Sequence, residues 1–333
     1  MKPWCSIGAR TGALRWGLTL GGLAFLVAAV TVAATSSSRI VTRVETSAVV
    51  LGLGITAALT GLSAQRWRML TEHLLGAPPR GFWIYYRSFI LGRTVALVLP
   101  ATAADLGVRP LIYRLDARSS GLSAFSGAVL EKLFDVWILL LSAGASLLLL
   151  LRLVDRRQFF LCLVLVHLGW IPCLRLVGPW AARIAPWLGG RLRSALPRHA
   201  VRLERVARSM EAAGRLLLTA EGSIILRDVA LLSLARYALI AVQLAVVGQA
   251  LGTSGIGVLE TVVALPAGQA GVLLALTPGG LGLYEAGLWA ALAALGLRRE
   301  EVAVFVVGQR LLISAYVVVL AGLTWSMAAL RRA

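Results

Sequence analysis

The sequence predicts an all-α polytopic membrane protein, and two observations support that prediction. The chain of 333 residues is 59% apolar and only 14% charged, whereas a soluble globular domain is roughly 45–50% apolar and about 25% charged. Its apolar residues also form runs of about 20, the length that crosses a hydrocarbon layer of about 30 Å, and arginine-rich stretches separate these runs. This pattern excludes a soluble enzyme, a disordered tail and a secreted disulfide scaffold.

The apolar runs predict about six spanning helices plus two broken or re-entrant helical hairpins. The predicted spans are 16–34, 46–64, 121–151, 159–178, 225–252 and 302–329. The first span could also be a signal peptide, but no small-residue cleavage site follows it, so we expect a retained helix. The hairpins are expected at 83–117 and 256–297, because helix breakers interrupt both runs. The breaking residues are Pro100 in the first and Pro278, Gly279, Gly280 and Gly282 in the second.

The order of these segments predicts an inverted repeat. Residues 1–155 and 156–333 each consist of two spans, a broken hairpin and a third span, and they begin on opposite sides of the membrane. Inverted repeats are typical of transporters, whose broken helices meet near the midplane and line a binding site. Here the meeting segments would be 99–102 and 277–280. The alternative is eight plain spans with proline kinks, which membrane helices tolerate.

The distribution of arginine predicts the orientation, because basic loops stay in the cytoplasm. The loop 180–223 contains eight arginines against three glutamates, so we place it in the cytoplasm together with both termini and the stretch 66–80. The expected location is the plasma or inner membrane. Orientation accounts for the net charge of +18, so no nucleic-acid partner is expected.

Ionisable side chains at membrane depth predict a polar site, since each costs at least about 2.5–3.5 kcal/mol and needs a partner or a wet cavity. Glu131 and Asp135 are four residues apart and share one helix face. Arg93 and Arg109 of the first hairpin are the nearest cations in the sequence. We expect an ion network that lines a cavity for a charged headgroup, with arginine as a phosphate clamp; a network that only neutralises itself is the alternative. The expected headgroup or cavity residues are Arg93, Asp105, Arg109, Glu131, Lys132, Asp135, Glu285 and Arg310.

The segment 277–285 is the most specific local pattern. Pro278 disfavours a helix at Thr277, glycines permit unusual backbone conformations, and a helix can restart near Leu283. Unpaired amides at that helix start would attract an anion such as phosphate. Glu285, in the first turn, would offset the positive end or hold a nearby arginine. A close helix contact through small residues is the competing interpretation.

Motifs for other chemistry are missing from the sequence. The three histidines and three cysteines have no spacing that suggests a metal site or a disulfide framework. No phosphate-binding loop for ATP and no Ser-His-Asp arrangement occurs. We therefore expect no metal, no cofactor and no ATP-driven transport by this chain alone.

Four motifs together resemble the lysylphosphatidylglycerol synthase transmembrane family, also described as flippase-like, over residues 45–329. They are Leu99-Pro100 followed by an acid and an arginine, Leu130-Glu131-Lys132-Leu133, Thr277-Pro278-Gly279-Gly280-Leu281-Gly282 with Glu285, and Gln309-Arg310-Leu311-Leu312. The pattern Pro-Gly-Gly-x-Gly-x-x-Glu is matched in full. In the first half the family usually has Gly-Gly-Asp or Gly-Glu, and this chain has Ala103-Ala104-Asp105.

The resemblance implies a membrane domain that moves a lipid headgroup, such as an aminoacylated phosphatidylglycerol or an isoprenoid-linked sugar phosphate, between leaflets. The best known members carry a soluble aminoacyl-transferase domain after the membrane part. This chain ends at Ala333, just after the last span, so we expect one integral membrane domain without a soluble catalytic domain.

We therefore expect a flippase-like transporter for a phospholipid or a polyprenyl-phosphate-linked lipid, rather than an enzyme. Its partners would be anionic or isoprenoid-linked membrane lipids, and Arg109, Glu131, Glu285 and Arg310 would line polar cavities open to one leaflet. Two alternatives stay open. One is an integral membrane transferase that acts on a lipid with an acid such as Asp105 as base. The other is a scaffold for a separate lipid-modifying enzyme.

Overall fold

The computed structural model describes residues 31, 45–75, 77–117, 121–169, 219–253, 255–274 and 277–330. Within these residues all regular structure is helical and no strand occurs, so the predicted all-α class is confirmed. Almost all of the predicted span 16–34, the end of the span 159–178 and most of the basic loop 180–223 lie outside the described residues. A helix covers 156–169, at the start of the predicted span 159–178.

Four helices in the described part of the chain are long and apolar enough to cross a membrane, and each matches a predicted span. They are α2 (Thr46–Met69), α6 (Gly121–Leu150), α9 (Ala220–Ala250) and α12 (Arg299–Leu330). Helix α2 extends beyond the predicted end at residue 64 and continues as the π-helix η1 (Leu70–Leu74). The start of the stretch 66–80 is therefore helical, which corrects its placement between spans.

Both predicted hairpins are broken at the expected positions. The first consists of α3 (Phe82–Val95), the short α4 (Ala101–Ala103), the π-helix η2 (Ala104–Val108) and α5 (Arg109–Ala117). The second consists of α10 (Val258–Leu274) and α11 (Leu283–Ala294). Proline explains the first break, because Pro100 cannot donate a backbone hydrogen bond and disfavours helix in the residue before it.

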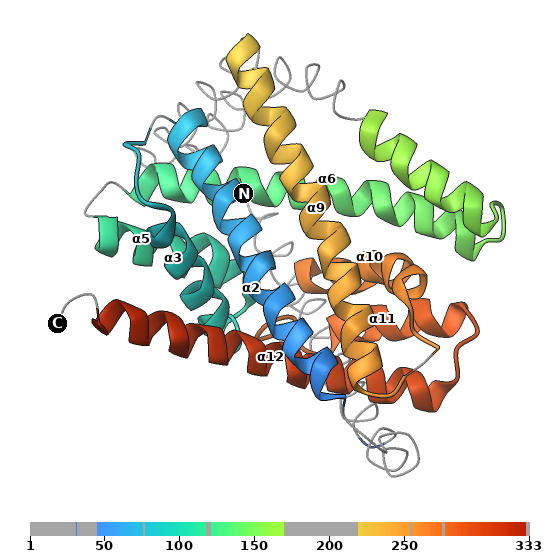
Figure 1. Cartoon of the computed structure of the whole chain (residues 1–333). Coiled ribbons are helices and arrows are strands. Elements are labelled where there is room, and N and C mark those ends of the chain that lie inside the picture. Colours follow the sequence, from blue (N-terminus) through green and yellow to red (C-terminus); the bar gives the residue numbers. More distant parts are fainter. Residues whose placement is uncertain are drawn as a thin grey trace, which may run out of the picture.

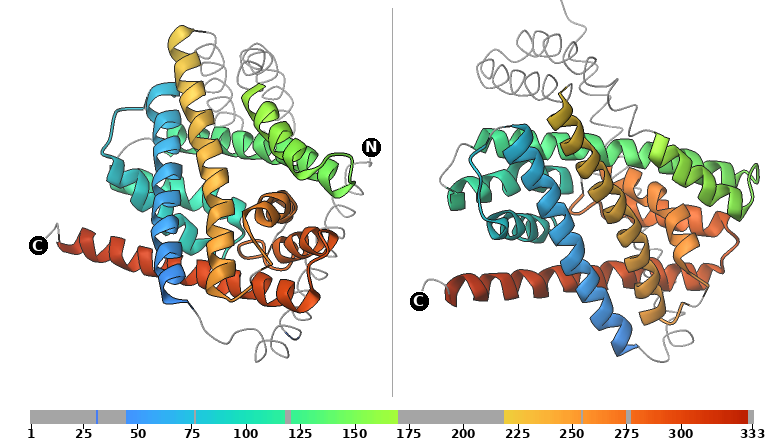
Figure 2. Two further views of the ribbon diagram at one scale, coloured as in Figure 1. Left: turned by 45° about the vertical axis from the view of Figure 1, so that its right-hand side comes forward. Right: turned by 45° about the horizontal axis from the view of Figure 1, so that its top comes forward.

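The long helices surround the hairpins in a regular arrangement. Helices α2 and α9 are antiparallel neighbours, and Ala48 near the start of α2 packs in one cluster with Ala250 at the end of α9. The first hairpin lies on one side of this pair and the second on the other, and α6 and α12 cross above and below them (Figure 1). The turned views in Figure 2 agree. Each hairpin packs against both crossing helices.

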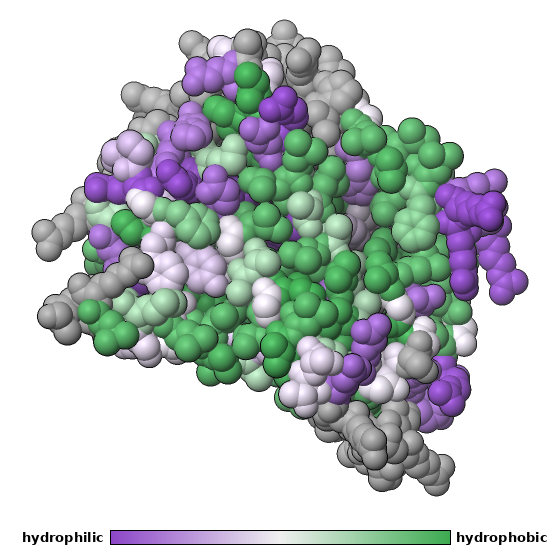
Figure 3. Space-filling view, in the orientation of Figure 1, coloured by the Kyte–Doolittle hydropathy of each residue, from purple (hydrophilic) through white to green (hydrophobic). Residues whose placement is uncertain are grey.

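The outer surface is suited to lipid rather than to water. Large apolar side chains are widely exposed on α6, α12 and the helix 156–169, among them Leu140 at 60%, Leu161 at 59% and Leu311 at 66%. Hydrophobic residues cover the middle of the face in Figure 3, and hydrophilic residues gather toward its edges. Soluble monomers rarely expose apolar patches of this extent. The chain is therefore a polytopic membrane protein.

Candidate functional site

The two helix breaks meet in the structure. Pro100 and Pro278 face each other in an isolated antiparallel bridge, and the amide of Gly279 donates a hydrogen bond of 3.1 Å to the carbonyl of Leu99. The bond satisfies backbone groups that a broken helix leaves without a partner, which would be costly in an apolar environment. The predicted meeting of segments 99–102 and 277–280 is confirmed.

Arg310 of α12 bonds to this meeting point. Its Nη2 donates to the carbonyl of Gly279 at 2.7 Å, and its Nε lies 3.4 Å from Oε1 of Glu285. Gly279 has a φ of 56°, and a Cβ there would lie 2.7 Å from Arg310 Nη2. We call the set Leu99, Pro100, Pro278, Gly279, Glu285 and Arg310 the break junction.

The start of α11 is neutralised from within the chain. The fully buried Glu285 accepts a hydrogen bond of 2.6 Å from the amide of Gly282, which is the residue before the helix. Such a carboxylate in the first turn offsets the positive helix end. Glu285 thus offsets the helix end and holds Arg310 at the same time. The expectation of unpaired amides at this helix start is corrected at Gly282, because the chain supplies its own anion.

A second cluster of charges surrounds Glu131 of α6. Its two carboxylate oxygens accept from Arg66 Nη2 and Arg109 Nη2, both at 2.5 Å, and these three side chains are 1–2% exposed. The guanidinium of Arg109 also stacks over the rings of Trp67 at 4.5 Å and Phe89 at 5.0 Å. Hydrogen bonds to charged groups are strongest when water is excluded. This side of the cluster is therefore closed to solvent.

The other side of the cluster is more open. Asp135 Oδ1 accepts from Arg66 Nη1 at 2.7 Å and lies 3.4 Å from Arg236 Nη1. Lys132 pairs with Asp105 and has its Nζ 3.8 Å from Asp135 Oδ2. The side chains of Asp105, Lys132, Asp135 and Arg236 are 16–29% exposed. We call these charges, together with Glu131, Arg66 and Arg109, the ion network.

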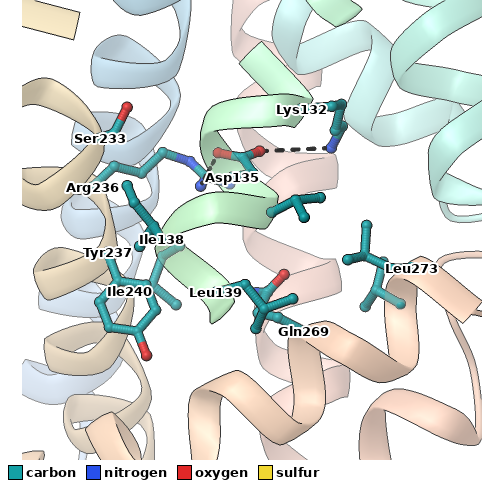
Figure 4. Close-up of a pocket in the computed structure, with 12 residues that line it drawn as sticks. Lys132, Asp135, Ile138, Leu139, Ser233, Arg236, Tyr237, Ile240, Gln269 and Leu273 are labelled. Atoms are coloured by element: carbon teal, nitrogen blue, oxygen red, sulfur yellow. Dashed lines mark hydrogen bonds and ion pairs between the residues drawn. The ribbon is translucent and has the colours of Figure 1, made fainter. Parts of the chain in front are cut away.

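A cavity of about 70 Å³ opens beside this exposed side, between α6, α9 and α10 (Figure 4). Lys132, Asp135 and Arg236 lie at one end of it. Its other walls are mostly aliphatic. The remaining lining residues are Val136, Ile138, Leu139, Ser233, Tyr237, Ile240, Gln269, Val272 and Leu273. The cavity is amphipathic: its charges lie at one end, and its other walls are mostly aliphatic, with Tyr237 and Gln269 as polar members away from the charges (Figure 4).

The structure separates the eight expected site residues by their surroundings. Lys132 and Asp135 line the cavity, and Asp105 pairs with Lys132.

The sequence led us to expect Arg109, Glu131, Glu285 and Arg310 in polar cavities, but none of them lines the cavity of Figure 4. The first three are buried in ion pairs, and Arg310 is 22% exposed in the break junction. Arg93 stacks 5.9 Å from the Phe89 ring and forms no ion pair with the described acids. Whether these residues bind a headgroup stays a prediction.

Two members of the network, Arg66 and Arg236, were not among the expected site residues. Arg66 follows the apolar run 46–64 and was placed between spans, whereas Arg236 lies within the predicted span 225–252 and so belongs to the ionisable residues at membrane depth. A signal for both exists in the sequence, because the pattern Ser-x-x-Arg occurs at 63–66 in α2 and at 233–236 in α9. No group of three or more potential metal ligands occurs in the described residues.

This fold and site define a helical, multi-spanning membrane protein with an ion network between two broken hairpins. The family model for the lysylphosphatidylglycerol synthase TM region matches residues 13–322. The chain belongs to this family, which confirms the resemblance seen in its motifs and relates the protein to lipid handling in the membrane. Searches of curated proteins and of solved structures returned no match.

Proposed function

We propose that this protein is a flippase-like transporter that moves the headgroup of a phospholipid or a polyprenyl-phosphate-linked lipid between the two leaflets. The amphipathic cavity carries the proposal. A membrane lipid also has a charged end and a hydrocarbon end, and the cavity offers charges from Lys132, Asp135 and Arg236 opposite aliphatic walls. Its partners would be anionic or isoprenoid-linked membrane lipids.

The size of the cavity limits what it can hold. A volume of about 70 Å³ is about half that of a cavity of about 150 Å³ that binds one benzene molecule, so it accommodates part of a headgroup and no acyl chain. The wall residue Leu273 is 43% exposed, which gives hydrocarbon chains an apolar surface beside the cavity. The headgroup would occupy the polar end while the tails stay in the bilayer.

The break junction supports a transporter over a static lipid-binding protein. Discontinuous helices that meet inside a repeat are typical of transporters, where they surround the substrate site. Here the segments that precede α4 and α11 meet at Pro100 and Pro278, and the amide of Gly279 donates to the carbonyl of Leu99. The proposal places both termini in the cytoplasm, because the basic loop 180–223 favours that orientation. It also places the protein in the plasma or inner membrane.

The test is transport by the purified full chain in lipid vesicles. Vesicles carry fluorescent phospholipids with anionic, zwitterionic or cationic headgroups, and an impermeant quencher reports how fast label from the inner leaflet reaches the outside. The first variant is Leu139→Trp, which fills the cavity without removing a charge. Its matched control is Leu140→Trp on the next residue of α6, which is 60% exposed and lies outside the cavity.

The expected result is faster exchange with the natural chain and with Leu140→Trp, and exchange near the protein-free rate with Leu139→Trp. Overpacking costs about 1–3 kcal/mol, so folding of each variant is checked by its elution volume and melting temperature in detergent. The proposal is overturned if no headgroup class exchanges faster with folded natural chain than without protein. Equal activity of the two tryptophan variants would remove the cavity from the pathway.

A further inference from the structure

The ion network and its neighbour Arg93 carry more positive than negative charge. The described part of the chain contributes four cations to the network, Arg66, Arg109, Lys132 and Arg236, against the three carboxylates of Asp105, Glu131 and Asp135. Arg93 is a fifth cation, within electrostatic range of Arg236, Asp105 and Glu131. Five cations facing three carboxylates leave two positive charges uncompensated. Charge at membrane depth requires a partner.

The break junction supplies no compensation. Its carboxylate, Glu285, is matched by one cation, Arg310, and by the amide of Gly282. Arg93 is also within electrostatic range of Tyr284, the residue before Glu285, so the acid nearest to it on this side already has a cation. A guanidinium without a carboxylate partner offers hydrogen-bond donors in a planar fork that matches phosphate.

Hydrogen-bond donors are also in excess. The Nε atoms of Arg66 and Arg109 are buried without an acceptor, and no acceptor in the described residues bonds to the guanidinium of Arg93. Arg236 uses Nε for Ser63 at 3.0 Å and Nη1 for Asp135 at 3.4 Å, which leaves its Nη2 available beside the cavity. The Nε atoms of Arg66 and Arg109 lie on the closed side of the network, but the free donors of Arg93 and Arg236 are matched by a ligand that accepts hydrogen bonds and carries negative charge.

We infer that the headgroup bound here is anionic, a phosphate monoester or diester held by the guanidinium groups of Arg93 and Arg236. The inference rests on the proposed function for its lipid and adds the sign of the headgroup charge. Lysylphosphatidylglycerol, which the family's description names, carries two ammonium groups and one phosphate. Its net charge is positive, so the network disfavours it. Phosphatidylglycerol, a phosphodiester with one negative charge, offsets one of the two positive charges, and a polyprenyl phosphate, a monoester with a charge of about −1.5 to −2, offsets most or all of both.

The experiment measures equilibrium binding to the purified full chain in a neutral maltoside detergent. Phosphatidylglycerol, lysylphosphatidylglycerol, phosphatidylcholine and inorganic phosphate are titrated separately, and saturable shifts in melting temperature and tryptophan fluorescence give apparent affinities. The variants are Arg93→Gln, which removes the charge, and Arg93→Lys, which keeps it. The matched control is Arg227→Gln, an exposed arginine of α9 that pairs with Asp228.

We expect phosphatidylglycerol to bind at least about tenfold more tightly than lysylphosphatidylglycerol, which is about 1.4 kcal/mol. Arg93→Gln should lose about tenfold in affinity for phosphatidylglycerol, whereas Arg93→Lys and Arg227→Gln should stay near the natural chain. Equal or tighter binding of lysylphosphatidylglycerol overturns the inference, and so does unchanged affinity in Arg93→Gln. An equal shift with inorganic phosphate alone identifies a free anion rather than a lipid as the ligand.

Two features keep the test decisive. If Arg93→Gln does not fold, the comparison of headgroups on the natural chain and the affinity of Arg93→Lys still decide the sign of the charge. Binding is measured without vesicles, so its outcome is independent of transport. Anion binding without lipid exchange would overturn the proposed transport activity and leave the anion site standing. Exchange of cationic lipids without a preference for anions would leave the transport activity standing and overturn the anion site.

Discussion

Arg66 of α2 and Arg236 of α9 each donate a hydrogen bond to the serine that lies three residues before the other. Arg66 Nη1 bonds to Ser233 Oγ at 3.0 Å, and Arg236 Nε bonds to Ser63 Oγ at 3.0 Å. Both arginines also approach Asp135 Oδ1. Because α2 and α9 are antiparallel, this exchange is what a two-fold axis between them would produce, and it supports the predicted inverted repeat.

The ion pairs between each hairpin and the following helix repeat with reversed charge. In the first half the hairpin supplies the cation, Arg109, and α6 supplies the acid, Glu131. In the second half the hairpin supplies the acid, Glu285, and α12 supplies the cation, Arg310. The position of the pair is retained while its sign is inverted. The division of the chain at residues 155 and 156 stays a prediction.

The reciprocal serine bonds predict equal effects of two substitutions. Ser63→Ala and Ser233→Ala each remove the acceptor of one arginine, and a hydrogen bond to a charged group contributes about 1.5–3 kcal/mol. Both variants should lower the free energy of unfolding by a similar amount, measured by denaturant titration in mixed micelles. The control is Ser126→Ala on α6, since the hydroxyl of Ser126 is buried without a partner and its loss should cost little. A clear difference between Ser63→Ala and Ser233→Ala would contradict the two-fold relationship.

Gly279 is predicted to tolerate no side chain. Its φ of 56° costs an L-residue about 1–2 kcal/mol, and a Cβ would lie 2.7 Å from Arg310 Nη2. Gly279→Ala should therefore lower the melting temperature and displace Arg310. Gly54→Ala is the control, because a Cβ at Gly54 in α2 meets nothing within 4 Å and alanine favours a helix by about 0.5–1 kcal/mol over glycine. Equal melting temperatures of the two variants would argue against the geometry of the break junction.

Loss of the Glu131 charge is predicted to destabilise the protein more than loss of a partly exposed ion pair. Glu131→Gln leaves Arg109 buried with a neutral partner and removes one of the two carboxylates of Arg66, and breaking a buried ion pair costs about 3–5 kcal/mol. The comparison is Asp116→Asn, whose pair with Arg87 is 3.3 Å long and 16–20% exposed. That loss should be smaller, because water partly solvates the freed arginine. Yield of folded protein and melting temperature give the measurement, and similar values for both variants would show that the network is solvated.

Local patterns in the sequence were sufficient for the backbone and for part of the site. The breakers at Pro100 and Pro278 placed both hairpins, and the spacing of Glu131 and Asp135 placed two acids on one face, where both accept from Arg66. Arg66 itself was not predicted, because hydrophobicity along the chain ends α2 before this residue. Helix α2 can include Arg66 because Glu131 and Asp135 of α6 neutralise its charge. That contact is tertiary, so no local sequence pattern shows it.

The sequence likewise does not show whether Arg93 or Arg109 is the partner of Glu131. Both lie on the first hairpin, and sequence separation alone does not decide between them. Arg109 is the first residue of α5, directly after the π-helix η2, and pairs with Glu131, while Arg93 lies in the last turn of α3, over the Phe89 ring. Which of the two cations reaches Glu131 depends on tertiary packing that no simple sequence pattern encodes.

The pair of Glu285 and Arg310 predicts an asymmetric response to single substitutions. Arg310→Gln leaves the carboxylate of Glu285, which is fully buried, without a cation, whereas Glu285→Gln leaves a guanidinium that is 22% exposed. In Glu285→Gln the carbonyl oxygen of the new side-chain amide can still accept from Gly282, and Arg310 can still donate to Gly279. Arg310→Gln should therefore cost about 3–5 kcal/mol, and Glu285→Gln clearly less.

A double-mutant cycle separates this pair from general damage. If the two side chains compensate each other, the variant carrying both substitutions should be more stable than the sum of the single losses implies, with a coupling of about 0.5–3 kcal/mol. The unfolding free energies are measured in the same micelles for all four proteins. Additive losses, or a larger loss in Glu285→Gln than in Arg310→Gln, would mean that Glu285 acts mainly as the cap of α11. In that case Arg310 would hold the break junction through the carbonyl of Gly279 alone.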